Sequence, residues 1–250
     1  MNNSISFLLI AKVKKIYSKL RKVLKISYAK YSISISTCFQ TITIFLFLQK
    51  IFIQPMDLNE IKIKLKSKSV GIAGCGGLGS NCAIALARVG VGRLIVVDFD
   101  IIEQSNLNRQ YYFFKQIGMK KCFALKENIE KINSNIDVIA FDKRIDNKSV
   151  IELFKNCDII VEAFDKAEMK QMLIETVLSE MPGKPIVSGL GMAGFGENNI
   201  IKTEKIGNLY ICGDRQKEIS DDLPPLAPRV GIVANMQANQ VLEILLSDSK

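Results

Sequence analysis

The stretch from Val70 to Ser80, which reads VGIAGCGGLGS, constrains the fold of this chain more than any other. A short apolar run enters a turn with glycine at Gly74, Gly76, Gly77 and Gly79, and an Ala- and Leu-rich helical pattern follows. Glycine permits a positive φ and lets the main chain approach a ligand closely. The helix directs unpaired N–H groups and a partial positive charge at the turn. The pattern therefore predicts a strand, turn and helix that hold a nucleotide phosphate.

An acidic residue at the end of the next predicted strand supports this interpretation. Asp98 stands nineteen residues after Gly79, where a nucleotide-binding fold carries an acid for the ribose hydroxyls. A glycine turn followed by such an acid is compatible with several nucleotide-binding folds. These two features alone therefore do not identify the nucleotide.

The remainder of the sequence alternates between short apolar runs and helical patterns. We expect a connector at 57–68, strands at 69–73, 93–98, 137–141, 158–163 and 185–188, and helices at 78–89, 118–134, 167–181 and 229–246. A capping box of Ser149 and Glu152 is expected to open a further short helix. The alternation predicts an α/β, Rossmann-like, doubly wound, mainly parallel sheet. Two β-like runs at 199–203 and 208–212 predict a C-terminal β extension, followed by a crossover loop at 213–228 and the closing helix.

Charge and composition divide the chain near Pro55. The net charge is +9, but residues 1–55 hold nine Lys and Arg and no acid, which leaves 25 basic and 25 acidic residues in the rest. The part at 56–250 therefore has no basic surplus for nucleic acid. We expect 1–55 to be a basic, apolar N-terminal extension and 56–250 to be the working domain. A membrane anchor through 31–53, a partner-binding arm and a stretch outside the working domain remain open for the extension, and the last is favoured.

Cysteine usage and the absence of histidine exclude several kinds of chemistry. No two of the six cysteines stand in a C-x-x-C spacing, so a zinc site is not predicted. Without histidine, Ser–His and Cys–His catalysis is excluded. The scattered cysteines predict reduced, mostly buried thiols in a cytoplasmic protein. These residues are Cys38, Cys75, Cys82, Cys122, Cys157 and Cys212.

The segment after the second predicted strand favours a triphosphate ligand. It carries Asp98, Asp100, Asn106, Arg109 and Gln110, and Lys121 follows Gly118. A guanidinium and an ammonium group in one crevice suit a triphosphate better than a pyrophosphate diester. Asp165 lies just past the fourth predicted strand, at the sheet edge where ligands bind, and is well placed to hold Mg²⁺ beside a triphosphate.

Taken together, these motifs resemble the ThiF/MoeB/HesA family, the bacterial relatives of ubiquitin-activating enzymes. The resemblance covers about residues 57–247 and looks most like the compact ThiF-like adenylyltransferases of the sulfur carrier protein ThiS. The pieces that carry it are the turn at 74–79, Asp98-x-Asp100, the run 105–110, Gly118-x-x-Lys121, Asp165, the run 227–231 and Gln237-Ala238.

The resemblance implies an ATP-dependent reaction. The C-terminal glycine of a small ubiquitin-fold sulfur carrier ending in Gly-Gly would be adenylylated with release of pyrophosphate, in thiamine biosynthesis or related sulfur transfer. It implies that the glycine turn seats the nucleotide, with Asp98 on the ribose and Asp100 also in the nucleotide site. Asn106, Arg109, Gln110 and Lys121 would hold the phosphates, and Asp165 would coordinate Mg²⁺. Arg109, Lys121 and Asp165 would be catalytic because charge neutralisation lets two anions react. A cytoplasmic homodimer is also implied.

The sequence departs from the family pattern at three points. Leu209 stands where a C-x-x-C pair with Cys212 would begin, and no second pair exists. No cysteine lies between Gly213 and Lys250, so a thioester or persulfide step has no evident nucleophile, and Cys212 is a poor candidate. Relatives use an arginine near the N-terminus that reaches across a dimer, but there is no arginine between Gln54 and Val70.

Other functions and simpler structural roles remain open. The alternatives are an enzyme resembling tRNA threonylcarbamoyladenosine dehydratase, an NAD-dependent oxidoreductase, and a non-catalytic module that binds the carrier. Asp165 could serve only as a helix N-cap, and Lys121 only as a surface charge. Asn106 and Gln110 could be loop-ordering amides. The aromatic run 111–114 is expected to pack in the core or at a dimer contact rather than to recognise a ligand.

Overall fold

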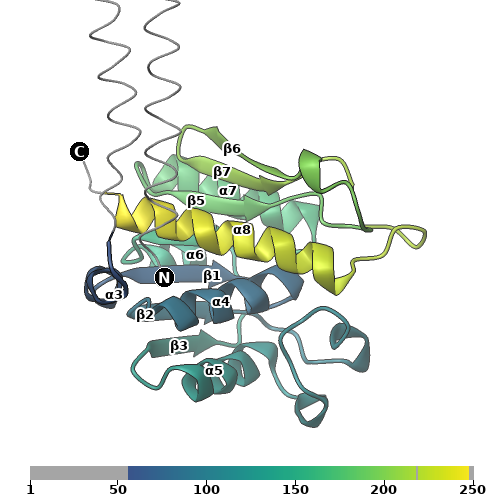
Figure 1. The fold of residues 1–250 in the computed structure, drawn as a ribbon, viewed down its shortest axis with the longest axis horizontal. Coiled ribbons are helices and arrows are strands. Elements are labelled where there is room, and N and C mark those ends of the chain that lie inside the picture. The colour runs from purple at the N-terminus through teal and green to yellow at the C-terminus, as the bar shows by residue number, and fades with distance from the viewer. Residues whose placement is uncertain (1–55, 218, 248–250) are drawn as a thin grey trace, which may run out of the picture. The chain divides into compact units, whose positions relative to one another are not determined.

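A computed structural model describes residues 56–217 and 219–247, so the expectations for 1–55, including membrane association, lie outside the described residues. The described strands form one sheet in the order β3-β2-β1-β4-β5-β7-β6, parallel throughout except for β6 (Figure 1). The strands are β1 (Ser69–Ala73), β2 (Arg93–Val97), β3 (Asp137–Phe141), β4 (Ile159–Glu162), β5 (Ile186–Gly189), β6 (Lys202–Ile206) and β7 (Leu209–Gly213). The predicted α/β fold with a mainly parallel sheet is confirmed.

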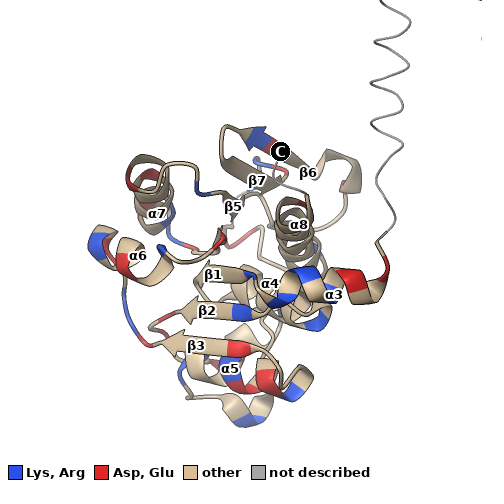
Figure 2. Cartoon of the chain, turned by 90° about the vertical axis from the view of Figure 1, so that its left-hand side faces the viewer, with Lys and Arg blue, Asp and Glu red and all other residues tan. Residues whose placement is uncertain are grey.

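Helices cover both faces of the sheet, as the apolar strands require. On one face α4 and α8 pack together with α3 and α5, and on the other face α6 packs against α7 (Figure 2). The two apolar clusters that result meet the sheet from opposite sides, one including Leu86 of α4 and the other Phe154 of α6. The helices are α3 (Leu58–Lys66), α4 (Gly77–Val89), α5 (Lys121–Ile132), α6 (Asn147–Phe154), α7 (Ala167–Glu180) and α8 (Ala227–Leu246).

The strand order places a ligand site between β1 and β4. From β1 the chain builds outward through β2 to β3, then returns to β4 on the other side of β1. At such a switch point the loops after two adjacent parallel strands turn to opposite faces and leave a crevice. The Ala163 N–H donates to the Ala73 carbonyl at 2.9 Å, so the glycine turn and the segment after β4 leave the sheet side by side.

Several predicted boundaries differ from the structure by one or two residues, and three differ by three residues, each for a local reason. Helix α6 begins after Asp146, whose carboxylate accepts from the Ser149 N–H at 2.8 Å, so the capping box is formed by these two residues rather than by Ser149 and Glu152. Helix α5 begins at Lys121, because Gly118 has a φ of 86° and cannot continue a helix. The first β-like run begins as a short 3₁₀ turn (Asn198–Ile200) before β6.

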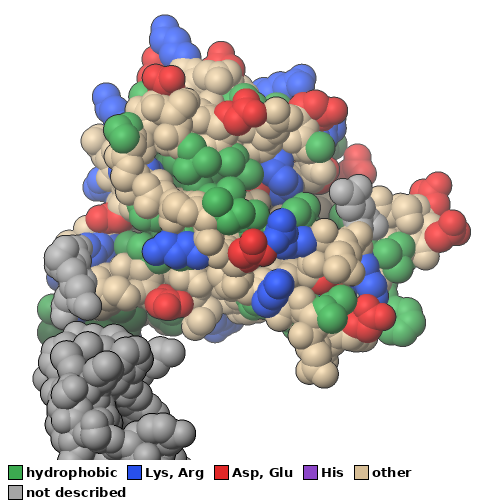
Figure 3. Space-filling view, turned by 90° about the horizontal axis from the view of Figure 1, so that it is seen from above, with side chains coloured by type: hydrophobic (Ala, Val, Ile, Leu, Met, Phe, Trp, Pro, Cys, Tyr) green, Lys and Arg blue, Asp and Glu red, His purple; other side chains and the backbone are tan. Residues whose placement is uncertain are grey.

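The described helices and one face of the surface bear on possible contact with a membrane. Among the described residues, none of the helices is both long and apolar enough to cross a bilayer. On the face in Figure 3, acidic and basic side chains are interspersed with one another and with hydrophobic ones.

Candidate active site

A cavity of about 410 Å³ opens at the carboxyl ends of the strands, at the β1/β4 switch point. Its lining comes from the loops after β1, β2, β3, β4, β5 and β7 and from the starts of α7 and α8. Nine residues expected at the site line it: Gly74, Gly76, Gly77, Asp98, Asp100, Arg109, Gln110, Lys121 and Asp165. Gly79 and Asn106 do not belong to this lining.

The glycine turn leaves main-chain donors facing the cavity. The N-cap of helix α4 is Gly76, which makes no side-chain capping bond. The first-turn N–H groups of the helix therefore have no side-chain acceptor at the N-cap. A Cβ on Gly77 would lie 3.0 Å from Val230 Cγ1 and 3.7 Å from Arg109 Cγ. The arginine stem therefore lies at van der Waals distance from the turn, and the tight neighbour of a side chain at Gly77 would be Val230. An uncapped helix N-terminus beside a guanidinium group suits an anion.

Gly79 has a packing role rather than a ligand-facing one. A Cβ on Gly79 would lie 1.8 Å from the Gly74 carbonyl oxygen and 3.2 Å from Ala163 Cβ. Gly74 has a φ of 96°, and a Cβ there would lie 2.6 Å from the Ala163 carbonyl oxygen. Both glycines let α4 and the turn approach the end of β4 closely.

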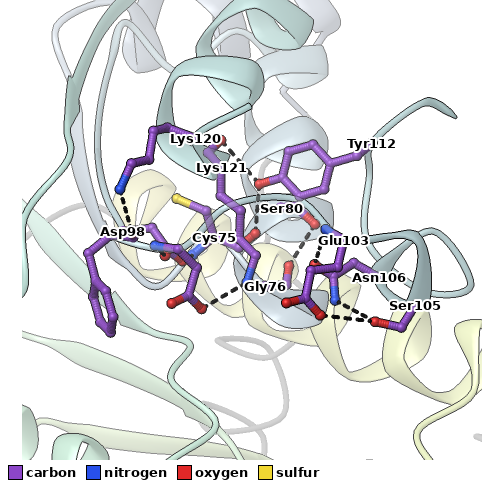
Figure 4. Close-up of polar contacts among 12 residues, drawn as sticks. Cys75, Gly76, Ser80, Asp98, Glu103, Ser105, Asn106, Tyr112, Lys120 and Lys121 are labelled. Atoms are coloured by element: carbon purple, nitrogen blue, oxygen red, sulfur yellow. Dashed lines mark hydrogen bonds and ion pairs between the residues drawn. The ribbon is translucent and has the colours of Figure 1, made fainter. Parts of the chain in front are cut away.

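Asp98 joins the end of β2 to the glycine turn (Figure 4). Its Oδ2 accepts from the Cys75 N–H at 2.6 Å and its Oδ1 from the Asp100 N–H at 2.8 Å. Burial raises the pKa of this carboxyl, while the two backbone donors act in the opposite direction. The side chain thus shapes the turn and also lines the cavity, where its remaining lone pairs can accept from a ligand hydroxyl.

Lys121 lies on the same side of the cavity and is paired. Its Nζ lies 2.9 Å from Asp100 Oδ2, and the lysine side chain is only 9% exposed. The buried Tyr112 hydroxyl donates to the Cys75 carbonyl at 2.7 Å and lies 3.2 Å from the Lys121 carbonyl (Figure 4). Tyr112 is therefore a core residue that joins the start of α5 to the glycine turn, whereas its neighbours Phe113 and Phe114 are exposed.

The loop that carries Arg109 is fastened to α4. Ser80 Oγ accepts from the Tyr111 N–H at 3.0 Å, and the Asn81 side-chain amide donates to the Arg109 carbonyl at 2.9 Å. Gln110 is buried in this loop, and its Oε1 has no hydrogen-bond partner among the described residues. A buried acceptor without a partner, in a residue that lines the cavity, is suited to a donor on a ligand.

Asn106 orders this loop instead of facing the cavity. Its Oδ1 accepts from the Glu103 N–H at 3.1 Å and closes a 3₁₀ turn (Gln104–Asn106), and the residue is 8% exposed. The expected contact between Asn106 and a phosphate therefore has no support in this geometry. The competing expectation, a loop-ordering amide, describes what the side chain does.

Asp165 follows β4 in a segment that a buried carboxylate organises. Glu162 is fully buried, its Oε1 accepts from the Phe164 N–H at 2.8 Å, and its Oε2 accepts from Ser188 Oγ at 2.5 Å. Lys170 Nζ lies 2.5 Å from the same Oε2 and 3.1 Å from the Gly189 carbonyl. Asp165 itself is exposed and lines the cavity. It is not the N-cap of α7, because that position belongs to Lys166.

Sequence reasoning missed several cations of the lining. Lys143 and Arg144 follow β3, and their position at a strand's carboxyl end was a usable signal. Lys166 and Lys170 follow β4 in the same way, whereas no sequence pattern indicated Lys217. With Arg109 and Lys121, seven basic side chains face three Asp carboxylates in the lining. Lys170 and Lys217 pair with Glu162 and Glu197 outside the lining, and the other five cations still exceed the three carboxylates, a surplus that attracts an anion.

The described residues hold no preformed metal cluster, and their cysteine thiols are buried. No group of three or more Cys, Asp or Glu side chains is arranged around a possible ion in the described part. All five described cysteines are free and buried. Burial raises the pKa of the Cys212 thiol, which disfavours a reactive thiolate.

The chain and known proteins share both sequence and architecture. The ThiF family profile matches residues 49–250. The adenylyltransferase and sulfurtransferase UBA4 of Eremothecium gossypii is 33% identical over 172 residues, which cover 68% of this chain and 36% of that protein. The adenylyltransferase and sulfurtransferase MOCS3 of Dictyostelium discoideum is 30% identical over 192 residues, which cover 72% of this chain and 43% of that protein. The chain thus spans less than half the length of these curated relatives.

Solved structures share the fold. The E. coli tRNA N6-threonylcarbamoyladenosine dehydratase TcdA in complex with ATP superposes with a TM-score of 0.68 at 18% identity, over 75% of this chain and 89% of that one. E. coli MccB with ATP superposes with a TM-score of 0.55 at 26% identity, over 74% of this chain and 57% of the MccB chain. Because the ThiF family profile spans the sheet, the glycine turn and the cavity described above, the chain belongs to the ThiF family.

Proposed function

We propose that the chain is an adenylyltransferase that uses ATP to activate the C-terminal glycine of a small ubiquitin-fold sulfur carrier. The observation that carries the proposal is the composition of the cavity. The uncapped start of α4, Arg109 and Lys121 are gathered at the β1/β4 switch point with the exposed carboxylate of Asp165. Relatives named as adenylyltransferases and a likeness to MccB solved with ATP support it.

The proposed reaction brings two anions together. A carboxylate oxygen of the carrier attacks the α-phosphorus of ATP, a new acyl O–P bond forms, and the bond to the bridging oxygen breaks as pyrophosphate leaves. Arg109 and Lys121 would offset the charge on the phosphates, and the α4 N–H groups would hold their oxygens. Asp98 would accept from the ribose. The step needs no proton transfer, which is consistent with a chain that contains no histidine.

Mg²⁺ is proposed as a partner of the triphosphate. Proteins commonly hold this ion through one or two carboxylates and the substrate's own phosphates. The donor set here fits that mode, because Asp165 is an exposed carboxylate that lines the cavity. When bound, the ion would supply charge neutralisation at the phosphates. Asp165 would hold it.

The finer points of the proposal concern partners and pathway. We propose a carrier ending in Gly-Gly, a role in thiamine biosynthesis or related sulfur transfer, a cytoplasmic location and a homodimer. The resemblance implies an arginine near the N-terminus at the dimer site, and the stretch between Gln54 and Val70 contains none. A tRNA dehydratase resembling TcdA is the second candidate, favoured by the shared fold, but residues 56–250 carry no basic surplus for tRNA.

ATP–pyrophosphate exchange tests the proposal. We expect incorporation of labelled pyrophosphate into ATP only when a ubiquitin-fold protein ending in Gly-Gly from the same organism is present. Asp165→Asn is expected to lower the exchange rate at least about a hundredfold, since it removes a charge-stabilising group. A matched control is Asp142→Asn, an acid after β3 that pairs with Lys120 and lies outside the cavity lining. Absence of exchange with every such carrier, or full activity of Asp165→Asn, would refute the proposal.

A further inference from the structure

One wall of the cavity differs from the rest in composition. It is formed by the loop after β5, the segment after β7 and the start of α8. Lys217 is the one basic residue among the lining residues of this wall, whose other members are small or apolar: Leu190, Gly191, Met192, Ile219, Pro225 and Val230. The opposite side, with the glycine turn, Arg109 and Lys121, carries several donors for a polyphosphate. A single cation in an apolar wall suits one carboxylate at the end of an extended, uncharged tail.

A buried ion pair fixes this wall. The guanidinium of Arg229 at the start of α8 pairs with Asp214 Oδ2, and the two side chains are 2% and 0% exposed. Arg229 Nη1 also donates to the Gly196 carbonyl at 2.5 Å, in the loop after β5. One guanidinium therefore joins the two loops to α8. Burial acts to raise the pKa of Asp214, but the backbone donors and Arg229 outweigh it and lower the pKa overall. The pair therefore stays ionised.

The same carboxylate holds the backbone of Lys217. Asp214 Oδ1 accepts from the Gln216 N–H at 2.8 Å and from the Lys217 N–H at 2.9 Å. The two described non-glycine residues with positive φ, Arg215 at 60° and Glu197 at 50°, lie in these two loops. Such backbone costs free energy and persists only where surrounding contacts impose it. Asp214 and Arg229 make contacts next to both strained residues, at Gln216 and at Gly196.

Lys217 is available to a ligand. Its Nζ lies 2.8 Å from Glu197 Oε2, but that carboxylate is 60% exposed and the lysine side chain 24% exposed. Exposed ion pairs of this kind add little stability, so the ammonium can exchange one carboxylate for another at small cost. Glu197 does not belong to the cavity lining, whereas Lys217 does.

We propose that Lys217 binds the C-terminal carboxylate of the carrier, and that the buried Asp214–Arg229 pair is a positioning pair that sets Lys217 in the cavity wall. The inference rests on the proposed adenylylation. Lys217 would orient the nucleophilic carboxylate and would form no covalent bond. Asp214 and Arg229 would touch neither reactant and would act through the backbone of Lys217.

The first test uses the exchange assay to measure the KM for the carrier and the KM for ATP separately. The carrier used is the Gly-Gly protein that supports exchange by the wild-type protein. We expect Lys217→Met to raise KM for the carrier about ten- to a hundredfold, the range of a hydrogen bond to a charged group, and to leave KM for ATP within about twofold. Lys217→Arg should restore most of the loss. Lys202→Met, on the exposed strand β6 and outside the cavity lining, should change neither KM.

A carrier with its C-terminal carboxylate converted to an amide identifies the group that Lys217 binds. The wild-type protein and Lys217→Met should bind this amide with the same Kd, measured by calorimetry. A weaker Kd of the variant for the amide, or an unchanged KM for the unmodified carrier, would overturn the assignment. If the wild-type protein exchanges pyrophosphate with no carrier, the proposed function itself fails. If the wild-type protein exchanges pyrophosphate with the carrier and Lys217→Met has the same KM for the carrier, only the present inference is refuted.

The second test separates positioning from a structural role. Asp214→Asn and Arg229→Gln should raise KM for the carrier about tenfold without changing KM for ATP, and Arg229→Gln combined with Lys217→Met should be no worse than Lys217→Met alone. Asp214→Asn keeps an oxygen acceptor for the backbone, so it provides a folded variant if Arg229→Gln unfolds. Thermal unfolding of each variant is the control. Equal increases in both KM values, or additive effects in the double variant, would overturn the positioning role.

Discussion

Replacing Lys170 by methionine should destabilise the domain strongly, because it leaves Glu162 as a buried charge without a counter-ion. The Glu162 side chain is 0% exposed and that of Lys170 is 16% exposed, and their charged atoms lie 2.5 Å apart. Methionine has a similar length and keeps most of the packing. The change therefore isolates the loss of the ammonium group.

The expected magnitude follows from the burial of the partner. Removing one member of a buried ion pair costs about 3–5 kcal/mol. The hydrogen bonds from Ser188 Oγ and the Phe164 N–H to the carboxylate remain, which places the expected loss near the lower end of that range. For a domain of this size 1 kcal/mol corresponds to about 2–4 °C, so the Tm should fall by about 10 °C.

Urea unfolding followed by circular dichroism provides the measurement, with a constant m-value as the check on two-state behaviour. Lys166→Met is the matched control, since Lys166 is exposed on the same connection and should shift stability by no more than about 0.5 kcal/mol. Adding Glu162→Gln to Lys170→Met should recover a large part of the loss, because the unpaired charge is gone. A loss below about 1 kcal/mol, or a double variant no better than the single one, would refute the reasoning.

The remaining predictions concern glycines and thiols. Gly79→Ala should lower the free energy of unfolding by about 3 kcal/mol, because its Cβ would lie 1.8 Å from a main-chain oxygen. Gly231→Ala in α8 meets nothing within 4 Å and should raise the free energy of unfolding by up to about 1 kcal/mol. Equal urea midpoints of the two variants would contradict this. Burial raises the pKa of Cys122 and of Cys157 to about 11, so iodoacetamide at pH 8 should label neither in the native protein and both in urea, as read by mass spectrometry. Since these thiols ionise at lower pH when unfolded, stability should fall as pH rises from about 9 to 11, and a flat profile would contradict the burial argument.

Much of the fold was predictable because local signals agreed with the final packing. Strands β1 and β3 begin and end where their apolar runs predict, since each run is bounded by residues that favour turns. The capping box was misplaced because Asp146 and Ser149 are both good caps, three residues apart, and sequence alone does not rank them. Of the aromatic run, Tyr112 packs in the core as expected, whereas Phe113 and Phe114 are exposed in the single chain, so core packing was wrong for these two and the dimer contact stays a prediction.

The site was predictable where its residues follow a strand or the glycine turn. Asp98, Arg109 and Asp165 belong to this group and line the cavity. Lys217 was not predicted, because no spacing pattern links it to Asp214, which accepts from its N–H, or to Arg229, which pairs with Asp214. The side chain of Asn106 orders its own loop, because its Oδ1 accepts from the Glu103 N–H, and the sequence does not show that contact.

The packing of α4 against α8 has a consequence for synthesis of the chain. The apolar side of α4 is covered by a helix that leaves the ribosome long after it, since every other described helix and strand lies earlier in the sequence than α8. A nascent chain that has not yet released α8 would present the neighbours of Leu86 to water and to other chains. Chaperone dependence should therefore be greatest late in translation and end once α8 has docked.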